Sequence, residues 1–165
     1  MRKIAPFIFI LFCTGLIFQA CNNTPQEKES YEAEWLGETQ QEIINTIEDQ
    51  FQGFSRTMVE VGYRYQELYW AGQDQNWEYA EYQREHIEEA LESGFVRRPE
   101  REASSQQFMS VALPEMEKII EEGNKEKFLQ NFTRFTASCN TCHAMEEVAF
   151  MVVKIPEKRN TIIYF

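Results

Sequence analysis

The feature that most constrains the fold is a run of apolar residues between positions 40 and 71, spaced three and four apart. Its members are Ile44, Ile47, Phe51, Phe54, Met58, Val61, Tyr65 and Leu68. This spacing places the side chains along one face of an α-helix, as in the seams of helix bundles. A helix with such a face needs other helices to cover it. We therefore predict a helix over residues 40–71 in an all-α protein.

The next segment repeats the helical pattern. Gly72 is expected to end the first helix, and Asp74 or Asn76 can cap the second. The second helix carries one core-facing stripe, formed by Trp77, Ala80, Arg84, Ile87 and Leu91. Gly94 is its expected end. Because the connection is short, these two helices should run antiparallel.

A third helix is predicted after a basic loop. Ser104 and Gln107 fit a capping box at its start. Its apolar stripe is formed by Met109, Leu113, Met116 and Ile120. Pro114 lies inside this stripe, where a proline removes a backbone hydrogen bond, so we expect a kinked helix.

The fourth helix should begin near Asn124 and continue to about Val153, before Pro156. Phe128, Phe132, Phe135, Cys139 and Cys142 again recur in steps of four and three, so both cysteines should face the core. The prediction is an antiparallel four-helix bundle over residues 38–156, with a tail at 157–165. A chain of 165 residues has room for one such core.

The N-terminal segment is typical of an export signal. Residues 1–20 combine the basic Arg2 and Lys3 with an apolar run too short to cross a bilayer comfortably. The run ends in Phe18-Gln19-Ala20-Cys21, which resembles the lipobox of bacterial lipoproteins and predicts lipidation of Cys21. A plain cleaved signal with Cys21 incidental is the alternative. Residues 21–37 are polar and aperiodic, which suits a flexible tether.

Net charge limits the partners. Cleavage before Cys21 removes Arg2 and Lys3 and no acidic residue, so 14 basic and 27 acidic side chains remain, a net charge of −13. This charge argues against nucleic acid as a partner. It suits attraction to a basic redox protein, although solubility explains it equally well.

The sequence Cys139-Asn140-Thr141-Cys142-His143 is a CxxCH, the motif of covalent c-type haem attachment. Residues three apart on a helix project to one side, so each thiol can form a thioether with one porphyrin vinyl group. His143 follows directly and can ligate the iron through its imidazole. A structural zinc site would need more ligands than this motif supplies, and a redox dithiol usually lies at the start of a helix that follows a strand.

A four-helix chain with CxxCH in its last helix resembles the class II c-type cytochromes, whose type member is cytochrome c-prime. The likeness covers roughly residues 38–156, and the segments Leu68–Gly72 and Asn76–Glu78 add to it. The ordinary cytochrome c fold is excluded on length, because it places CxxCH near its N-terminus and only 22 residues follow His143 here.

The resemblance implies that the first helix covers the distal face of the haem. Met58 is then the candidate for the second axial ligand, with a role as core filler as the alternative. Without a distal ligand, Phe51, Phe54, Met58 and Tyr65 would form an apolar pocket for carbon monoxide or nitric oxide.

The remaining candidates have plainer interpretations. Met109 and Met116 are expected in the core, Met145 and Met151 lie too near His143 to reach the other haem face, and His86 should be solvated. Four arginines could pair with haem propionates or a partner, or simply lie in solvent: Arg97, Arg98, Arg101 and Arg134.

These observations give a first hypothesis of a monohaem c-type cytochrome that carries electrons. It would be lipid-anchored in the bacterial cell envelope, on a periplasmic or other extracytoplasmic face. Its partners would be a redox protein and the anchoring membrane, and the sequence also allows a homodimer. The alternatives are a five-coordinate haem protein that binds nitric oxide or carbon monoxide, and a thiol–disulfide protein without haem. No nucleophile–base pair, phosphate loop or carboxylate pair indicates an enzyme.

Overall fold

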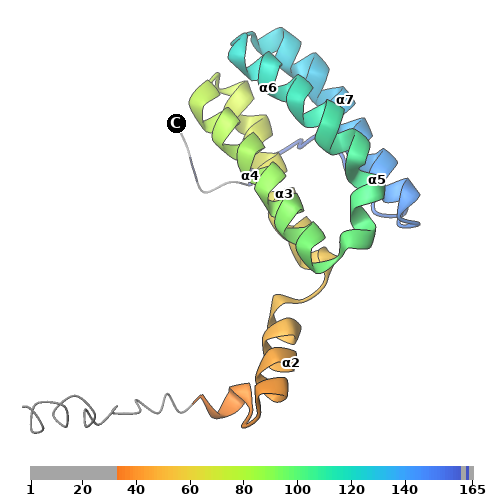
Figure 1. Ribbon diagram of the computed structural model, residues 1–165. Helices are drawn as coiled ribbons and strands as arrows, with labels where there is room; N and C mark the ends of the chain where they lie inside the picture. Colours follow the sequence, from red (N-terminus) through yellow and green to blue (C-terminus); the bar gives the residue numbers. More distant parts are fainter. Residues whose placement is uncertain (1–32, 161–162, 164–165) are drawn as a thin grey trace, which may run out of the picture. The chain divides into compact units, whose positions relative to one another are not determined.

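The computed structural model describes residues 33–160 and 163. The predicted signal sequence, Cys21 and most of the tether lie outside this range. Within it the protein is helical, with four long helical stretches and no strand, which confirms the all-α prediction (Figure 1). None of the described helices is long and apolar enough to span a membrane.

The structure divides into two units, at Ile43 and Ile44. The described part of the first contains η1 (Glu34–Leu36) and the start of α2 (Gln40–Phe51). A capping box begins α2: the Glu42 carboxylate accepts from the backbone N–H of Thr39, and the Thr39 hydroxyl accepts from that of Glu42. These hydrogen bonds, first of all those with Thr39, lower the pKa of Glu42.

The helix predicted over 40–71 is broken, so that prediction is wrong at one point. After α2, Gln52 has a left-handed φ of 60°, and α3 (Phe54–Gln73) begins behind Gly53. Ile44, Ile47 and Phe51 are exposed, so the apolar seam is a core face only in α3. The periodicity does not register the break, because Phe51 and Phe54 keep the three-residue step of a continuous helix.

The second helix, α4 (Trp77–Arg97), is capped as expected, with the Asn76 carboxamide accepting from the backbone N–H of Tyr79. Its predicted stripe is buried from Ala80 to Leu91. Gly94 does not end the helix. An added Cβ there would lie 2.7 Å from the Phe54 ring, so this glycine allows α3 and α4 to approach closely.

The third helical stretch runs without a gap from Pro99 to Glu121. It comprises η2 (Pro99–Arg101), α5 (Glu102–Gln107), the π-helical η3 (Phe108–Ala112) and α6 (Leu113–Glu121). The predicted capping box is wrong, because Pro99 starts the stretch earlier and Ser104 lies inside α5. Pro114 is the second residue of α6, two residues after the end of the π-helical turn, and such a turn is a common device for absorbing a lost i→i−4 hydrogen bond.

The fourth helix, α7 (Lys125–Met145), begins after Asn124, whose side chain accepts from the backbone N–H of Lys127. It ends at Met145, well before the predicted Val153. A left-handed residue, Glu147, turns the chain, and the N–H of Val148 donates to the carbonyl of His143 at 2.9 Å. This pairing is a Schellman motif.

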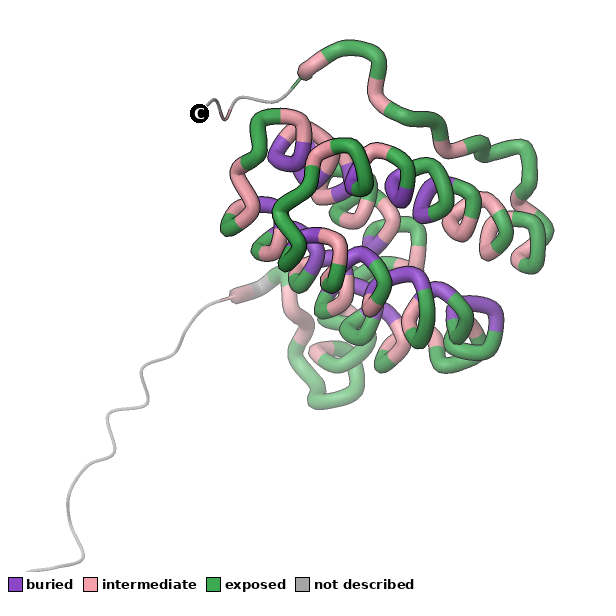
Figure 2. The backbone as a smooth tube through the Cα atoms, turned by 90° about the horizontal axis from the view of Figure 1, so that it is seen from above, coloured by how far each residue is buried: buried purple, intermediate pink, exposed green. Residues whose placement is uncertain are grey.

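The core lies between these helices. α3 packs against α4 and α7, and α6 packs against α4 and α7. Figure 2 shows the buried stretches of α3, α4, α6 and α7 turned toward one another. The centre is aromatic: the rings of Tyr65 and Phe132 lie 4.9 Å apart, as do those of Phe108 and Phe135. Such clusters bury large apolar areas and fix the position of α7 against its neighbours.

Candidate functional site

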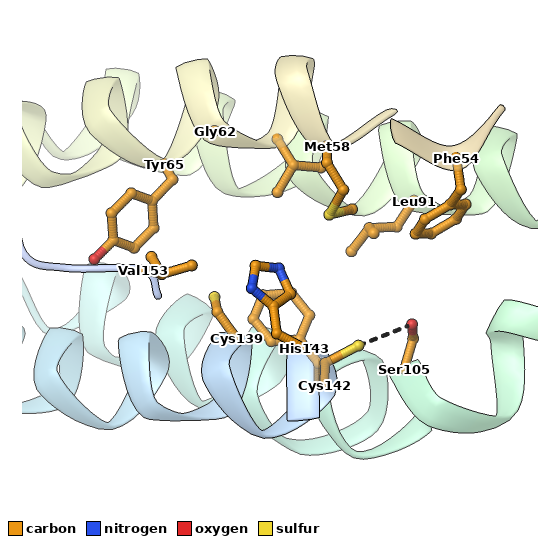
Figure 3. A pocket seen from close by; sticks show the side chains of 12 residues that line it. Phe54, Met58, Gly62, Tyr65, Leu91, Ser105, Cys139, Cys142, His143 and Val153 are labelled. Atoms are coloured by element: carbon orange, nitrogen blue, oxygen red, sulfur yellow. Dashed lines mark hydrogen bonds between the residues drawn. The ribbon is translucent and has the colours of Figure 1, made fainter. Parts of the chain in front are cut away.

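The CxxCH residues occupy the last two turns of α7 and open into one pocket. The three phenylalanines of α7 are buried, which directs Cys139 and Cys142 toward the same interior face. The pocket is lined from α3, α4, α5, η3, α7 and the segment after α7, by Phe54, Met58, Val61, Gly62, Tyr65, Leu91, Ser105, Phe108, Cys139, Cys142, His143 and Val153 (Figure 3). Cys139 packs against the core, and both cysteines line the pocket.

The pocket is apolar and partly open. The cavity has a volume of about 120 Å³. Cofactor and ligand pockets measure roughly 300–1,000 Å³. At about 120 Å³ this cavity is smaller than that range, so a large planar group would extend beyond it toward solvent.

Both cysteines are free thiols. Burial, together with the neighbouring Cys142, raises the pKa of Cys139 to about 12. Cys142 lies 3.5 Å from the hydroxyl of Ser105. A reactive dithiol requires a thiol with a lowered pKa near a positive charge or a helix N-terminus. Cys139 has the opposite surroundings: an apolar pocket near the C-terminus of a helix.

The His143 imidazole projects into the pocket toward α3 (Figure 3). Its Nδ1 lies 2.6 Å from the backbone carbonyl of Met151. A carbonyl oxygen only accepts hydrogen bonds, so Nδ1 carries the hydrogen, and in the neutral ring Nε2 has the lone pair. This is the usual arrangement of a metal-ligating histidine, whose second nitrogen is held by a carbonyl or carboxylate.

The residues predicted on the distal side are mostly brought together. Phe54, Met58 and Tyr65 line the pocket from α3, across from α7 (Figure 3). Phe51 is not a pocket residue: it is 58% exposed and belongs to α2, because the helix breaks behind it. Burial raises the pKa of Tyr65 to about 12, and its hydroxyl lies 2.7 Å from Thr136 Oγ1.

The other methionines and the second histidine lie away from the pocket. Met116 is fully buried in the core and Met109 is packed against it, as predicted, whereas Met145 and Met151 are exposed. His86 is about one quarter exposed, and its Nδ1 lies 2.8 Å from the carbonyl of Tyr82.

The four arginines have separate surroundings. Arg97 donates to Thr57 Oγ1, Arg101 pairs with Glu146, and Arg134 is exposed. Arg98 donates to the carbonyl of Arg97. The residues that line the CxxCH pocket include none of these four arginines.

Sequence reasoning missed the part of the site that comes from the segment after α7. Val153 lines the pocket, and Met151 holds His143 through its carbonyl. Backbone contacts leave no mark in residue type. Recognising in the sequence that α7 ends early would have revealed this segment. Glu147 gives no such indication, because glutamate does not normally mark a left-handed turn.

In the part of the chain that the structure describes, no three His, Cys, Asp or Glu side chains converge as a metal site would require. A haem iron needs only one or two protein ligands, so this finding leaves the CxxCH interpretation as it stands. Comparison with models of protein families, with curated proteins and with solved structures found no match to this chain.

Proposed function

We propose that this protein is an exported, lipid-anchored monohaem c-type cytochrome that transfers electrons, built as an antiparallel four-helix bundle like the class II cytochromes. One observation carries the proposal. Cys139, Cys142 and His143 open together into an apolar pocket whose facing wall holds Met58. Chance placement of a CxxCH motif gives no reason for such a pocket.

The residues fit a haem. Each thiol would add its S–H across one vinyl group to form a thioether, and the free Nε2 of His143 would ligate the iron. Met58 would supply the sulfur ligand from α3. The bound haem would contribute an iron that changes its charge by one electron. The apolar lining would hold the porphyrin face and limit the access of water.

A gas-binding haem protein is the second candidate, favoured by Gly62. This glycine lies one helical turn after Met58, and a Cβ added to it would meet nothing within 4 Å. The α3 wall is therefore open beside Met58. If Met58 does not ligate, this apolar space suits carbon monoxide or nitric oxide.

The absorbance spectrum separates these candidates. The protein is expressed with a cytochrome c maturation system, reduced, and measured before and after carbon monoxide is added. The electron carrier predicts covalent haem with a low-spin spectrum that carbon monoxide leaves unchanged. A carbon monoxide-dependent change would support gas binding instead. Absence of covalent haem would contradict both, and reversible Cys139–Cys142 oxidation would then support the dithiol alternative.

Met58 is tested with a matched methionine. Met58→Ala should convert the low-spin spectrum to a high-spin, carbon monoxide-sensitive one. Met109→Ala removes another partly buried methionine that lies outside the pocket, so its spectrum should match the wild type. A low-spin spectrum that survives Met58→Ala would exclude Met58 as the ligand.

A further inference from the structure

The chain after α7 returns along the helix that carries the CxxCH motif. We refer to residues 146–160 as the strap. Its first turn is the Schellman motif, in which Glu147 and Val148 donate to the carbonyls of Ala144 and His143. The strap thus begins next to His143 itself. Its path back brings the Met151 carbonyl to the imidazole.

Asn140, a variable position of the motif, holds the strap with both ends of its carboxamide. Its Oδ1 accepts from the backbone N–H of Val153 at 2.8 Å, and its Nδ2 donates to the carbonyl of Val153 at 3.0 Å. One carboxamide thus satisfies both backbone polar groups of Val153, as a neighbouring strand would in a β-sheet. Thr141, the other variable position, donates only to the carbonyl of Ala137 within α7.

Other contacts hold the strap farther from His143. Tyr65 donates to the carbonyl of Lys154 at 3.2 Å, and Arg159 pairs with Asp74 at 2.5 Å. Phe150, Met151 and Val152 are all more than half exposed. Apolar packing therefore does little to fix Met151. Apart from His143 itself, the side-chain hydrogen bonds nearest to Met151 along the strap are those of Asn140 with Val153, and within the strap the Met151 N–H donates to the carbonyl of Val148 at 2.8 Å.

We propose that Asn140 is a positioning residue for His143. Asn140 fixes Val153, which lies two residues after Met151 in the strap. It thereby keeps the Met151 carbonyl on Nδ1 of His143, and so fixes both the tautomer and the direction of the His143 ring. The part of this inference that concerns iron rests on the proposed function. The part that concerns the strap and the ring does not.

We call the two hydrogen bonds between Asn140 and Val153 the clamp, and its loss has a defined consequence. Without the carbonyl, Nδ1–H turns to water and the ring is free to rotate. A histidine that donates to a carbonyl is the more basic ligand, and a basic ligand favours the oxidised metal. Asn140→Ala should therefore shift the midpoint potential of an attached haem to a more positive value.

The first test is hydrogen exchange of the purified full chain. In Asn140→Ala, the Val153 amide should exchange about fivefold faster or more, as expected for the loss of a hydrogen bond. Thr141→Ala is the matched control and should leave this rate unchanged. Equal exchange in wild type and Asn140→Ala would overturn the clamp. In Asn140→Asp, which keeps an acceptor for the Val153 N–H, the Val153 amide should exchange at close to the wild-type rate, and fast exchange in that variant would contradict protection by this acceptor.

The second test reads His143. With haem attached, the midpoint potential should rise in Asn140→Ala and stay at the wild-type value in Thr141→Ala. If no haem is attached, ¹⁵N NMR of the two histidines replaces it. The Nδ1–H signal of His143 should then be lost on substitution while that of His86 persists. An unchanged potential, or an unchanged Nδ1–H signal, would overturn the positioning role, whereas missing haem alone would contradict only the proposed function.

Discussion

At the scale of single residues, α3 contains two glycines with opposite surroundings. Gly72 is buried, and a Cβ added to it would overlap the ring of Phe128, which is fully buried. Gly62 faces open space. Gly72 is therefore needed for contact between α3 and α7 rather than as the end of the helix, which continues to Gln73.

This contrast predicts opposite effects of the same substitution. Gly72→Ala should lower the free energy of unfolding by about 1–3 kcal/mol, because the Phe128 ring must move in a packed core. Gly62→Ala should raise it by about 0.5–1 kcal/mol, because alanine favours the helix and meets nothing. Urea unfolding of both variants measures the difference. Similar midpoints would show that Phe128 is not packed against Gly72.

Tyr65 predicts a dependence on alkaline pH. Its pKa is about 12 in the folded protein and 10.0 when unperturbed, so the unfolded chain releases the proton first. Stability that is present below pH 10 should be lost as the pH rises from about 10 to 12. Cys139, whose unperturbed pKa is 9.0, should add to this loss of stability from about pH 9 in the protein without haem. A thioether bond to haem would remove this effect, because the sulfur would no longer carry a proton.

Replacement of the hydroxyl isolates its share. Tyr65→Phe should cost about 0.5–1.5 kcal/mol near pH 7, where the bonds to Thr136 and Lys154 are lost. The deficit relative to wild type should shrink above pH 10, because the variant has no phenol to ionise. Tyr63→Phe, at an exposed tyrosine, should show neither effect. Unfolding midpoints between pH 7 and 11 provide the measurement.

At the scale of elements, three helices end in the same way with different residues. The residue two places beyond the helix is left-handed in each case: Gln75 after α3, Gly123 after α6 and Glu147 after α7. Glycine adopts this conformation without a steric cost, whereas residues with a Cβ do not. Two of the three ends therefore carry local strain.

Substitutions that add or remove glycine at these helix ends should reveal the strain. Gln75→Gly should raise the free energy of unfolding by about 0.5–1 kcal/mol, and Gly123→Ala should lower it by about 1 kcal/mol. Thermal or urea unfolding of the two variants tests this pair. Opposite signs are expected, and a loss of stability in Gln75→Gly would contradict the assignment of a left-handed turn there.

At the scale of the whole molecule, the prediction concerns anchoring. Cys21 lies outside the described residues and is expected to carry lipid, so Cys21→Ser should prevent incorporation of labelled palmitate and release the protein from membranes. Cys13→Ser is the matched control and should change neither property. Fractionation and labelling in a bacterial host give the answer. Membrane retention of the Cys21 variant would contradict lipidation.

Much of the fold was predictable because helix periodicity is a local property. The stripe of α4, the cap at Asn76, the start of α7 near Asn124 and the aromatic face of α7 all appear in the structure at the predicted positions. The break at Gln52 and the early end of α7 were missed for one reason. Left-handed residues with side chains have no strong signature in the sequence, so neither helix end was marked by residue type.

The sequence by itself determined the chemistry: the spacing of Cys139, Cys142 and His143 on one helical face, and the apolar stripes that bury them. Only the tertiary structure decided their surroundings. It placed Met58 and Gly62 across the pocket and returned the strap to Asn140 and His143. The physical reason is range. Helical spacing depends on neighbours three and four residues away, whereas a backbone carbonyl that meets an imidazole depends on the path of the whole chain.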